Sequence, residues 1–263
     1  MTSIFVGIDI ACAKSKPLPI CAVQRSNGTL TPLPIREEIL GRFPRGPGNR
    51  EVKERYPFRA HAKNVAGLLI DTCHRKGWNI ERVAIDAPAA APTSGKRSCE
   101  AQINSEGMSL IPTPIEGRWS AIRKVCTSHL AQKGPLNRLP FGNMVWMLYG
   151  FELFRELRSL SKFDVLEVYP YSIIANLDRG CPHKKTEEGY RRQLFLIAKM
   201  TSWDPTRLEA LLKTHATGGR HDRLDAFMPR GWRRFPRSFV EPMATNLILM
   251  TQFGYLASRT RDL

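Results

Sequence analysis

The strongest constraint on this chain is an acidic residue within an apolar strand near its start. The segment Ile4–Ala11 is apolar at most positions, and Asp9 lies inside it. A near-continuous apolar run of this length is typical of a strand that is covered on both faces, as in α/β proteins. An ionised carboxylate in such a strand is costly without a compensating charge, so Asp9 requires a partner, and a metal ion is one candidate.

Two later segments repeat the pattern of an apolar strand that ends in an acid. In Val83–Pro88 the acid is Asp86, and the proline breaks the strand soon after it. In Val165–Pro170 the acid is Glu167. Three strands can therefore each supply one carboxylate to a common site.

A late segment, His221–Ala226, follows the break at Gly218-Gly219 and carries two more acids. Asp222 and Asp225 are three residues apart, so they share one face if the segment is a helix. Mg²⁺ prefers oxygen ligands and keeps some of its waters, so a few carboxylates suffice to hold it, and Mn²⁺ suits the same ligands. We therefore expect Mg²⁺ or Mn²⁺ as the cofactor.

The charge of the chain indicates a polyanionic partner. Its net charge of +16 and pI near 10 favour DNA or RNA, although a solvated basic surface that only aids solubility is the alternative. The six cysteines show no CxxC spacing, which argues against a zinc site. The sequence shows neither a signal peptide nor a membrane-spanning stretch, so we expect a cytoplasmic protein without a membrane partner.

The apolar patterns predict one α/β domain over residues 1–263. Besides the strands that carry acids, two short strands are expected, at Pro17–Val23 and Leu30–Ile35. Residues 87–140 form a basic insertion that we predict to be largely irregular, because Pro and Gly interrupt it. The expected helices are Arg59–Lys76, Arg97–Glu106, Asn143–Leu160, Glu187–Met200 and Thr206–His215.

The order of these elements resembles the RNase H-like fold, with three strands, a helix, a strand that ends in an acid and a late acidic helix. More narrowly, the chain resembles the domain-of-unknown-function-429 family over roughly Ile4 to Phe227. The resemblance rests on the ordered motifs Val6-Gly7-Ile8-Asp9, Ile85-Asp86-Ala87-Pro88, Arg97-Ser98-Cys99-Glu100, Glu167-Val168-Tyr169-Pro170, Lys184–Arg191 and His221–Ala226. It implies an RNase H-like mixed sheet of five strands flanked by helices, and the RuvC-like nuclease activity predicted for that family.

The acids suit the chemistry of phosphodiester hydrolysis. This reaction builds negative charge on the attacking and leaving oxygens, which two divalent ions about 3.5–4 Å apart stabilise. We expect Asp9 to bridge two such ions, with Asp86 and Asp225 completing the two sites. Glu167 and Asp222 are expected as further ligands or as neighbours of the ligands. The alternatives are a salt bridge for Glu167 and a helix cap for Asp222.

Basic and aromatic residues are candidates for contacts with nucleic acid. Arg97 is expected to hold a phosphate, and Trp119 to stack on a base. Lys184 and Lys185 are expected to contact the phosphate backbone in a similar way. The alternatives are an Arg97–Glu100 pair at i,i+3 and, for the other residues, a solvated loop surface.

The segment after Asp225 departs from the family pattern. Pro229 and Gly231 end the closing helix early and leave residues 229–263 as an atypical tail. This departure supports one alternative, a non-catalytic module of the same fold that binds nucleic acid or docks on a partner. Another is an ATP-binding enzyme of the actin and sugar-kinase type, which is disfavoured because the residues after Asp9 lack the Gly and Thr that cradle phosphate.

Overall fold

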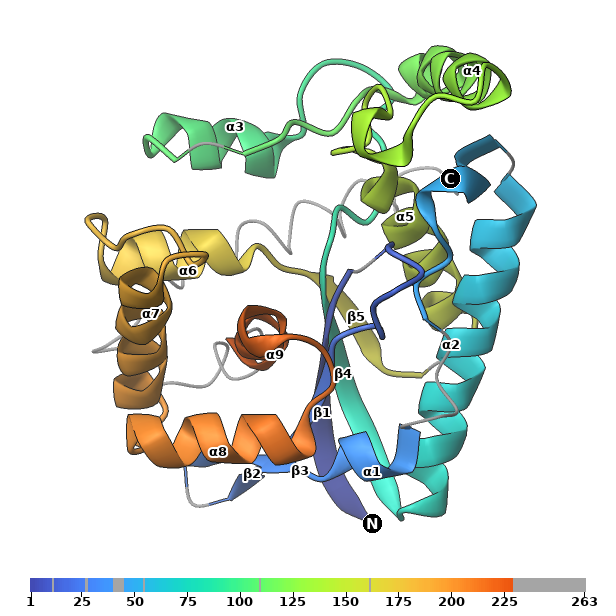
Figure 1. Cartoon of the computed structure of the whole chain (residues 1–263). Helices are drawn as coiled ribbons and strands as arrows, with labels where there is room; N and C mark the ends of the chain where they lie inside the picture. The colour runs from blue at the N-terminus through green and yellow to red at the C-terminus, as the bar shows by residue number, and fades with distance from the viewer. Residues whose placement is uncertain are drawn as a thin grey trace, which may run out of the picture.

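The computed structural model describes residues 1–10, 12–26, 28–39, 45–53, 55–108, 110–160 and 162–228. Its centre is a mixed sheet of five strands in the order β3-β2-β1-β4-β5 (Figure 1). The strands are β1 (Thr2–Asp9), β2 (Ile20–Ser26), β3 (Thr29–Leu33), β4 (Trp78–Asp86) and β5 (Asp164–Glu167). β1, β2 and β3 pair antiparallel, whereas β4 and β5 extend the sheet parallel to β1. The predicted α/β class with a mixed five-stranded sheet is thus confirmed.

The two predicted short strands are present but shifted along the chain. β2 begins at Ile20 rather than at Pro17, because proline lacks the N–H group that a strand ladder needs. β3 ends at Leu33, directly before Pro34, and the short helix α1 (Ile35–Ile39) follows. Pro19 therefore directly precedes β2 and Pro34 directly follows β3, whereas Pro32 is tolerated inside β3 because β3 is an edge strand.

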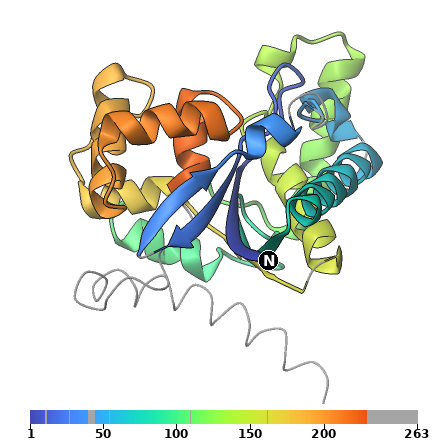
Figure 2. The same cartoon turned by 90° about the horizontal axis from the view of Figure 1, so that it is seen from below.

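Helices cover both faces of the sheet (Figure 2). α2 and α5 pack together on one face, and α8 and α9 pack on the other. The bounds are α2 (Arg55–Arg75), α3 (Ser98–Ser105), α4 (Glu116–Ala131), α5 (Val145–Leu160), α6 (Pro170–Leu177), α7 (Glu187–Met200), α8 (Pro205–His215) and α9 (Arg220–Phe227), with 3₁₀ turns η1 (Asn49–Lys53) and η2 (Leu136–Arg138).

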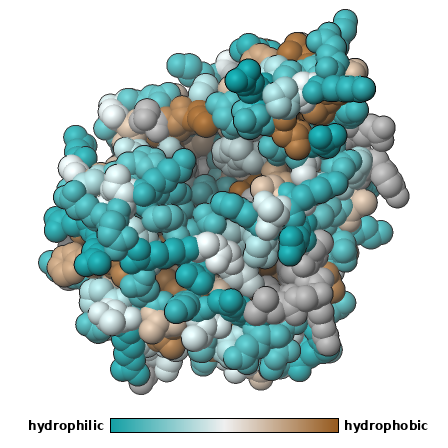
Figure 3. Space-filling view, in the orientation of Figure 1, coloured by the Kyte–Doolittle hydropathy of each residue, from teal (hydrophilic) through white to brown (hydrophobic). Residues whose placement is uncertain are grey.

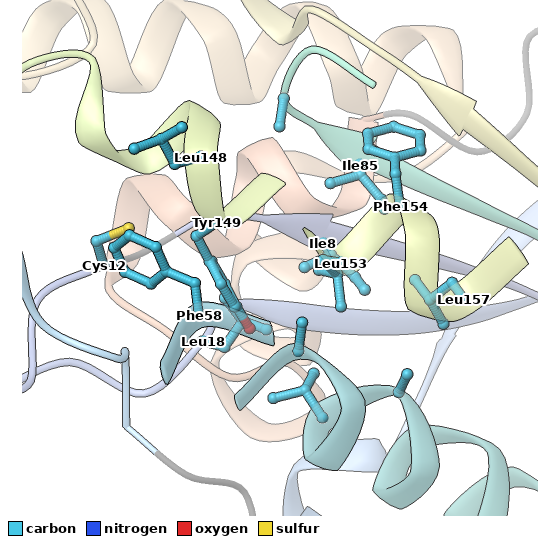
Figure 4. Packing of buried hydrophobic residues seen from close by; sticks show 14 of the residues in the cluster. Ile8, Cys12, Leu18, Phe58, Ile85, Leu148, Tyr149, Leu153, Phe154 and Leu157 are labelled. Carbon is cyan, nitrogen blue, oxygen red and sulfur yellow. The ribbon is translucent and has the colours of Figure 1, made fainter. Parts of the chain in front are cut away.

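The first core lies between the sheet and helices α2 and α5 (Figure 4). Ile4, Val6 and Ile8 of β1 point into it and are fully buried. α2 contributes an apolar stripe whose members are all buried, namely Ala62, Val65, Ala66, Leu69 and Cys73. Because side chains alternate along a strand, the odd-numbered residues of β1, including Asp9, face the other side of the sheet.

A second core fills that other side, beneath α6, α7, α8 and α9. Phe5 of β1 packs against it, as the alternation requires. α9 packs on β1, β2 and β4, and its Leu224 and Phe227 are buried there. The helix that carries Asp225 therefore lies over the face toward which Asp9 points (Figure 1).

The prediction that residues 87–140 are largely irregular is wrong. The segment holds α3, close to the predicted Arg97–Glu106 helix, and α4, which has 16 residues. α4 buries Trp119, Ile122 and Cys126, a sparse stripe at i, i+3 and i+7 that charged neighbours obscure in the sequence. α6 is a further helix that the patterns do not predict, whereas α5, α7 and α8 lie close to the predicted bounds.

Hydrophilic side chains cover most of the molecular face seen in Figure 3. Within the described residues, every helix is too short or too polar to cross a bilayer. The predicted tail, residues 229–263, lies outside the part of the chain that the structure describes.

Candidate functional site

Asp9 and Asp86 lie side by side at the carboxyl ends of two parallel strands. They are the last residues of β1 and β4, and the strand register pairs them directly. Both residues are partly exposed. Since paired residues of neighbouring strands point to the same face, both carboxylates lie on the side of the sheet that α9 covers.

A β-bulge creates this pairing. The register of β1 against β4 shifts by one residue between Ile4 and Phe5, because β4 carries an extra residue there. Without the bulge, Asp9 would pair with Ile85 instead of Asp86, and the two carboxylates would point to opposite faces of the sheet.

Burial and mutual repulsion favour the protonated forms of both carboxyl groups. Burial, together with the charges of Asp86 and Asp225, raises the pKa of Asp9 well above its ordinary value. Burial and the charge of Asp225 raise the pKa of Asp86 to about 7. A cation between the two groups would remove the repulsion and favour the charged carboxylates.

Asp225 of α9 completes the carboxylate cluster, by which we mean Asp9, Asp86 and Asp225. This residue is 2% exposed, and its carboxylate accepts a hydrogen bond from the ammonium of Lys184. Lys184 lies between α6 and α7, and the charges of Asp9 and Asp86 also raise its pKa. The sequence predicts this lysine on the nucleic-acid backbone, but the structure pairs it with Asp225, an acid of the cluster.

Glu167, at the end of β5, is held by Arg97. Both of its carboxylate oxygens accept hydrogen bonds from the guanidinium group, one at 2.6 Å, and Oε2 also accepts from the N–H of Ala89 at 2.9 Å. The register pairs Glu167 with Ile85, whose side chain lies in the first core. Arg97 Nη1 also lies 3.5 Å from Glu100 Oε1. The salt bridges weighed as alternatives for Glu167 and Arg97 are therefore both present.

Asp222 caps the helix that carries Asp225. Its Oδ2 accepts a hydrogen bond from the backbone N–H of Gly219 at 3.2 Å, which is the helix-cap alternative for this residue. The ring of the adjacent His221 packs edge-on against Tyr190, with 5.1 Å between the ring centroids. Among the described residues, none hydrogen-bonds the buried Nδ1 of His221.

Trp119 is a packing residue, which corrects its expected role in base stacking. The residue is 6% exposed, and its ring packs edge-on against Phe151 with 5.7 Å between the centroids. A base can stack only on an open ring face, which a buried tryptophan does not offer. Lys185, in contrast, is exposed next to Lys184, as contact with a phosphate backbone requires.

The carboxylate cluster does not match the expected site for two metal ions. Within the described residues, no three His, Cys, Asp or Glu side chains converge to hold a metal. Asp225 is bound to Lys184, which leaves Asp9 and Asp86 as a pair of partly exposed carboxylates. Mg²⁺ binds through one or two carboxylates and keeps several waters, so Asp9 and Asp86 are the residues that could hold a single divalent ion.

Tyr169, to which the sequence analysis gives no role of its own, lies near the cluster, and Tyr171 packs against it. Tyr169 follows β5, and burial and the charge of Asp86 raise its pKa to about 12. Its ring packs against Tyr171, with 5.9 Å between the centroids, and Tyr171 is 46% exposed. The signal in the sequence is a pair of tyrosines around Pro170, directly after a strand that ends in an acid. Tyr171 offers the open ring that Trp119 lacks.

Comparisons of the chain with protein-family models, with curated proteins and with solved structures gave no match. The resemblance to the domain-of-unknown-function-429 family therefore stays a prediction. The candidate site consists of the paired Asp9 and Asp86, the lysine-bound Asp225 and the neighbouring tyrosines.

Proposed function

We propose that this chain is an RNase H-like nuclease that hydrolyses phosphodiester bonds in DNA or RNA with Mg²⁺ or Mn²⁺. The observation that carries the proposal is the direct pairing of Asp9 and Asp86 on the side of the sheet that α9 and its Asp225 cover. The order of strands and helices supports it. Three consecutive antiparallel strands, a helical connection and a parallel strand that ends in an acid match the order that the resemblance predicts.

The charge distribution supports the same chemistry. A divalent ion held by Asp9 and Asp86 would neutralise the charge that develops on the phosphate oxygens during hydrolysis. The net charge of +16 attracts a polyanion to the molecule, while the paired carboxylates attract the metal to one place. In this proposal the exposed Lys185, which follows Lys184 in the chain, contacts the phosphate backbone.

Cleavage assays on wild type and Asp9→Asn test the proposal. Substrates are single-stranded DNA and RNA, duplexes, an RNA–DNA hybrid and a branched junction, each with Mg²⁺, Mn²⁺ or EDTA. We expect metal-dependent cleavage that Asp9→Asn lowers by roughly a hundredfold or more, since several kcal/mol of charge stabilisation are lost. Asp71→Asn changes an exposed aspartate of α2 in the same way and should cleave like wild type. Equal cleavage by wild type and Asp9→Asn would refute the proposal.

One observation favours a second candidate, a non-catalytic module that binds nucleic acid through the same fold. Lys184 already neutralises Asp225, as in a site that needs no metal. Under this reading, wild type and Asp9→Asn would bind nucleic acid equally well, and neither would cleave it or bind Mn²⁺.

A further inference from the structure

We propose that Lys184 is a built-in cation of the carboxylate cluster, so that the site binds one divalent ion, at Asp9 and Asp86, instead of two. This inference rests on the proposed function. It replaces the expected pair of metal ions with one ion and one ammonium group, and it gives Lys184 a role inside the site.

The first support is the ion pair between an accessible lysine and a buried acid. The side chain of Lys184 is 39% exposed, whereas that of Asp225 is 2% exposed. A buried carboxylate is costly to ionise without a compensating charge, and the ammonium supplies that charge. A second metal ion would have to displace the ammonium from Asp225 or share its carboxylate with it. Displacement would leave the ammonium without its carboxylate, and sharing would bring two cations close together, and both changes are unfavourable.

The second support is charge balance in the cluster. The two positive charges of one divalent ion and the single charge of the ammonium together balance the negative charges of the three carboxylates. A second divalent ion would leave the cluster with excess positive charge. Asp222 does not offer an extra ligand in this arrangement, because its carboxylate is held at the cap of α9 by the N–H of Gly219.

The third support is the way in which the chain fixes the segment that carries Lys184. The hydroxyl of Thr186 donates to the carbonyl of His183 at 2.9 Å and accepts from the N–H of Gly189 at 3.0 Å. The N–H of Lys185 donates to His183 Nδ1 at 3.2 Å. A Cβ at Gly189 would lie 2.2 Å from the carbonyl oxygen of His183, so the first turn of α7 packs directly on this segment. Lys184 therefore lies in a turn that these hydrogen bonds and the packing of α7 hold in place.

Lys184 would also hold a substrate phosphate in this arrangement. Its ammonium donates to Asp225 but has further donor capacity, and its side chain is partly accessible. If Asp9 and Asp86 hold a metal ion, that ion and the ammonium of Lys184 would both supply positive charge to a bound phosphate. Such a lysine acts as a point charge on phosphate, as lysines in other phosphate sites do.

The test counts the ions that bind to the full chain. Titration with Mn²⁺, followed by the EPR signal of the free ion, should give one ion per chain for wild type. Lys184→Met keeps the length of the side chain but removes its charge, and it should bind two ions per chain. Lys184→Arg keeps the charge and should bind one. Lys63→Met, the same change at an exposed lysine of α2, should bind one ion as wild type does.

The outcomes separate this inference from the proposed function. Two ions bound by wild type would overturn the inference while leaving a metal-dependent nuclease intact. One ion bound by a folded Lys184→Met would also overturn it. If Lys184→Met fails to fold, the count for wild type and Lys184→Arg still decides the matter. No Mn²⁺ binding by any variant would overturn the proposed function together with the inference.

Discussion

Replacing Asp86 with asparagine should stabilise the metal-free protein at high pH and leave it nearly unchanged at low pH. The pKa of Asp86 is about 7 in the folded protein, against an ordinary value of 3.8. Between these pH values the folded state binds the proton more tightly than the unfolded state does. The free energy of unfolding therefore falls as the pH rises from about 4 to about 7. Asparagine has nearly the same shape and carries no charge, so the variant does not undergo this loss.

The magnitude follows from the two pKa values. A change from 3.8 to about 7 corresponds to roughly 4 kcal/mol. Because Asp86 is partly exposed and solvent screens its charge, we expect a gain of about 2–3 kcal/mol for Asp86→Asn at pH 8. At pH 4 both side chains are neutral in the folded state, and the difference should be below about 0.5 kcal/mol.

Urea denaturation followed by circular dichroism, in buffers that contain EDTA, measures this difference at pH 4 and pH 8. Asp71→Asn is the matched control, because it removes an exposed aspartate and should leave stability unchanged at both pH values. The same free-energy difference between Asp86→Asn and wild type at both pH values would refute the reasoning. So would a loss of stability at pH 8, because it would mean that the negative charge of Asp86 is favourable in the fold.

Three further predictions concern the metal, the Arg97–Glu167 pair and the tyrosines. In thermal melts at pH 8, Mg²⁺ at a hundred times its dissociation constant for wild type should stabilise wild type by about 2.7 kcal/mol. The same Mg²⁺ concentration should stabilise wild type less at pH 5, and it should not stabilise Asp9→Asn at all. Glu167→Gln should destabilise the fold by about 2 kcal/mol in urea, since the mostly buried Arg97 then loses its closer anion and keeps the carboxylate of Glu100 at 3.5 Å; an unchanged midpoint would contradict this. Tyr171→Ala should weaken single-strand binding by about 1–3 kcal/mol in fluorescence anisotropy, whereas Phe195→Ala, at a similarly exposed ring, should not.

The strand ends of the site are predictable from sequence because local pattern sets them. An apolar run that stops at an acid and is followed by a proline marks both the strand and its end, as at Asp86. Helices with long apolar stripes, such as α5 and α7, are predictable for the same reason. α4 is not, because it buries only three residues, with Leu130 partly buried against the core, and the charged Arg123 and Lys124 interrupt this stripe.

The partners of the acids are not predictable in this way. Lys184 and Asp225 are 41 positions apart, and Arg97 and Glu167 are 70 apart. Nothing in their local sequence selects one acid over another. The choice depends on how α9 and the segment before α7 come together over the sheet. Sequence patterns therefore indicate which residues carry charge, whereas the tertiary structure determines which of these residues form ion pairs in the absence of a ligand.

The pairing of Asp9 with Asp86 is only partly predictable from the sequence. In β4, Ile80 and Val83 both pack toward the first core, although strict alternation would place an even-numbered and an odd-numbered residue on opposite faces. The sequence shows that the alternation of apolar residues shifts by one position between Ile80 and Val83. The same pattern, however, also fits a strand that begins at Val83. Only the pairing with β1 over its whole length shows that the strand continues through a bulge. Since a slip of one residue would move Asp86 away from Asp9, the bulge is the feature of the sheet on which the candidate site depends.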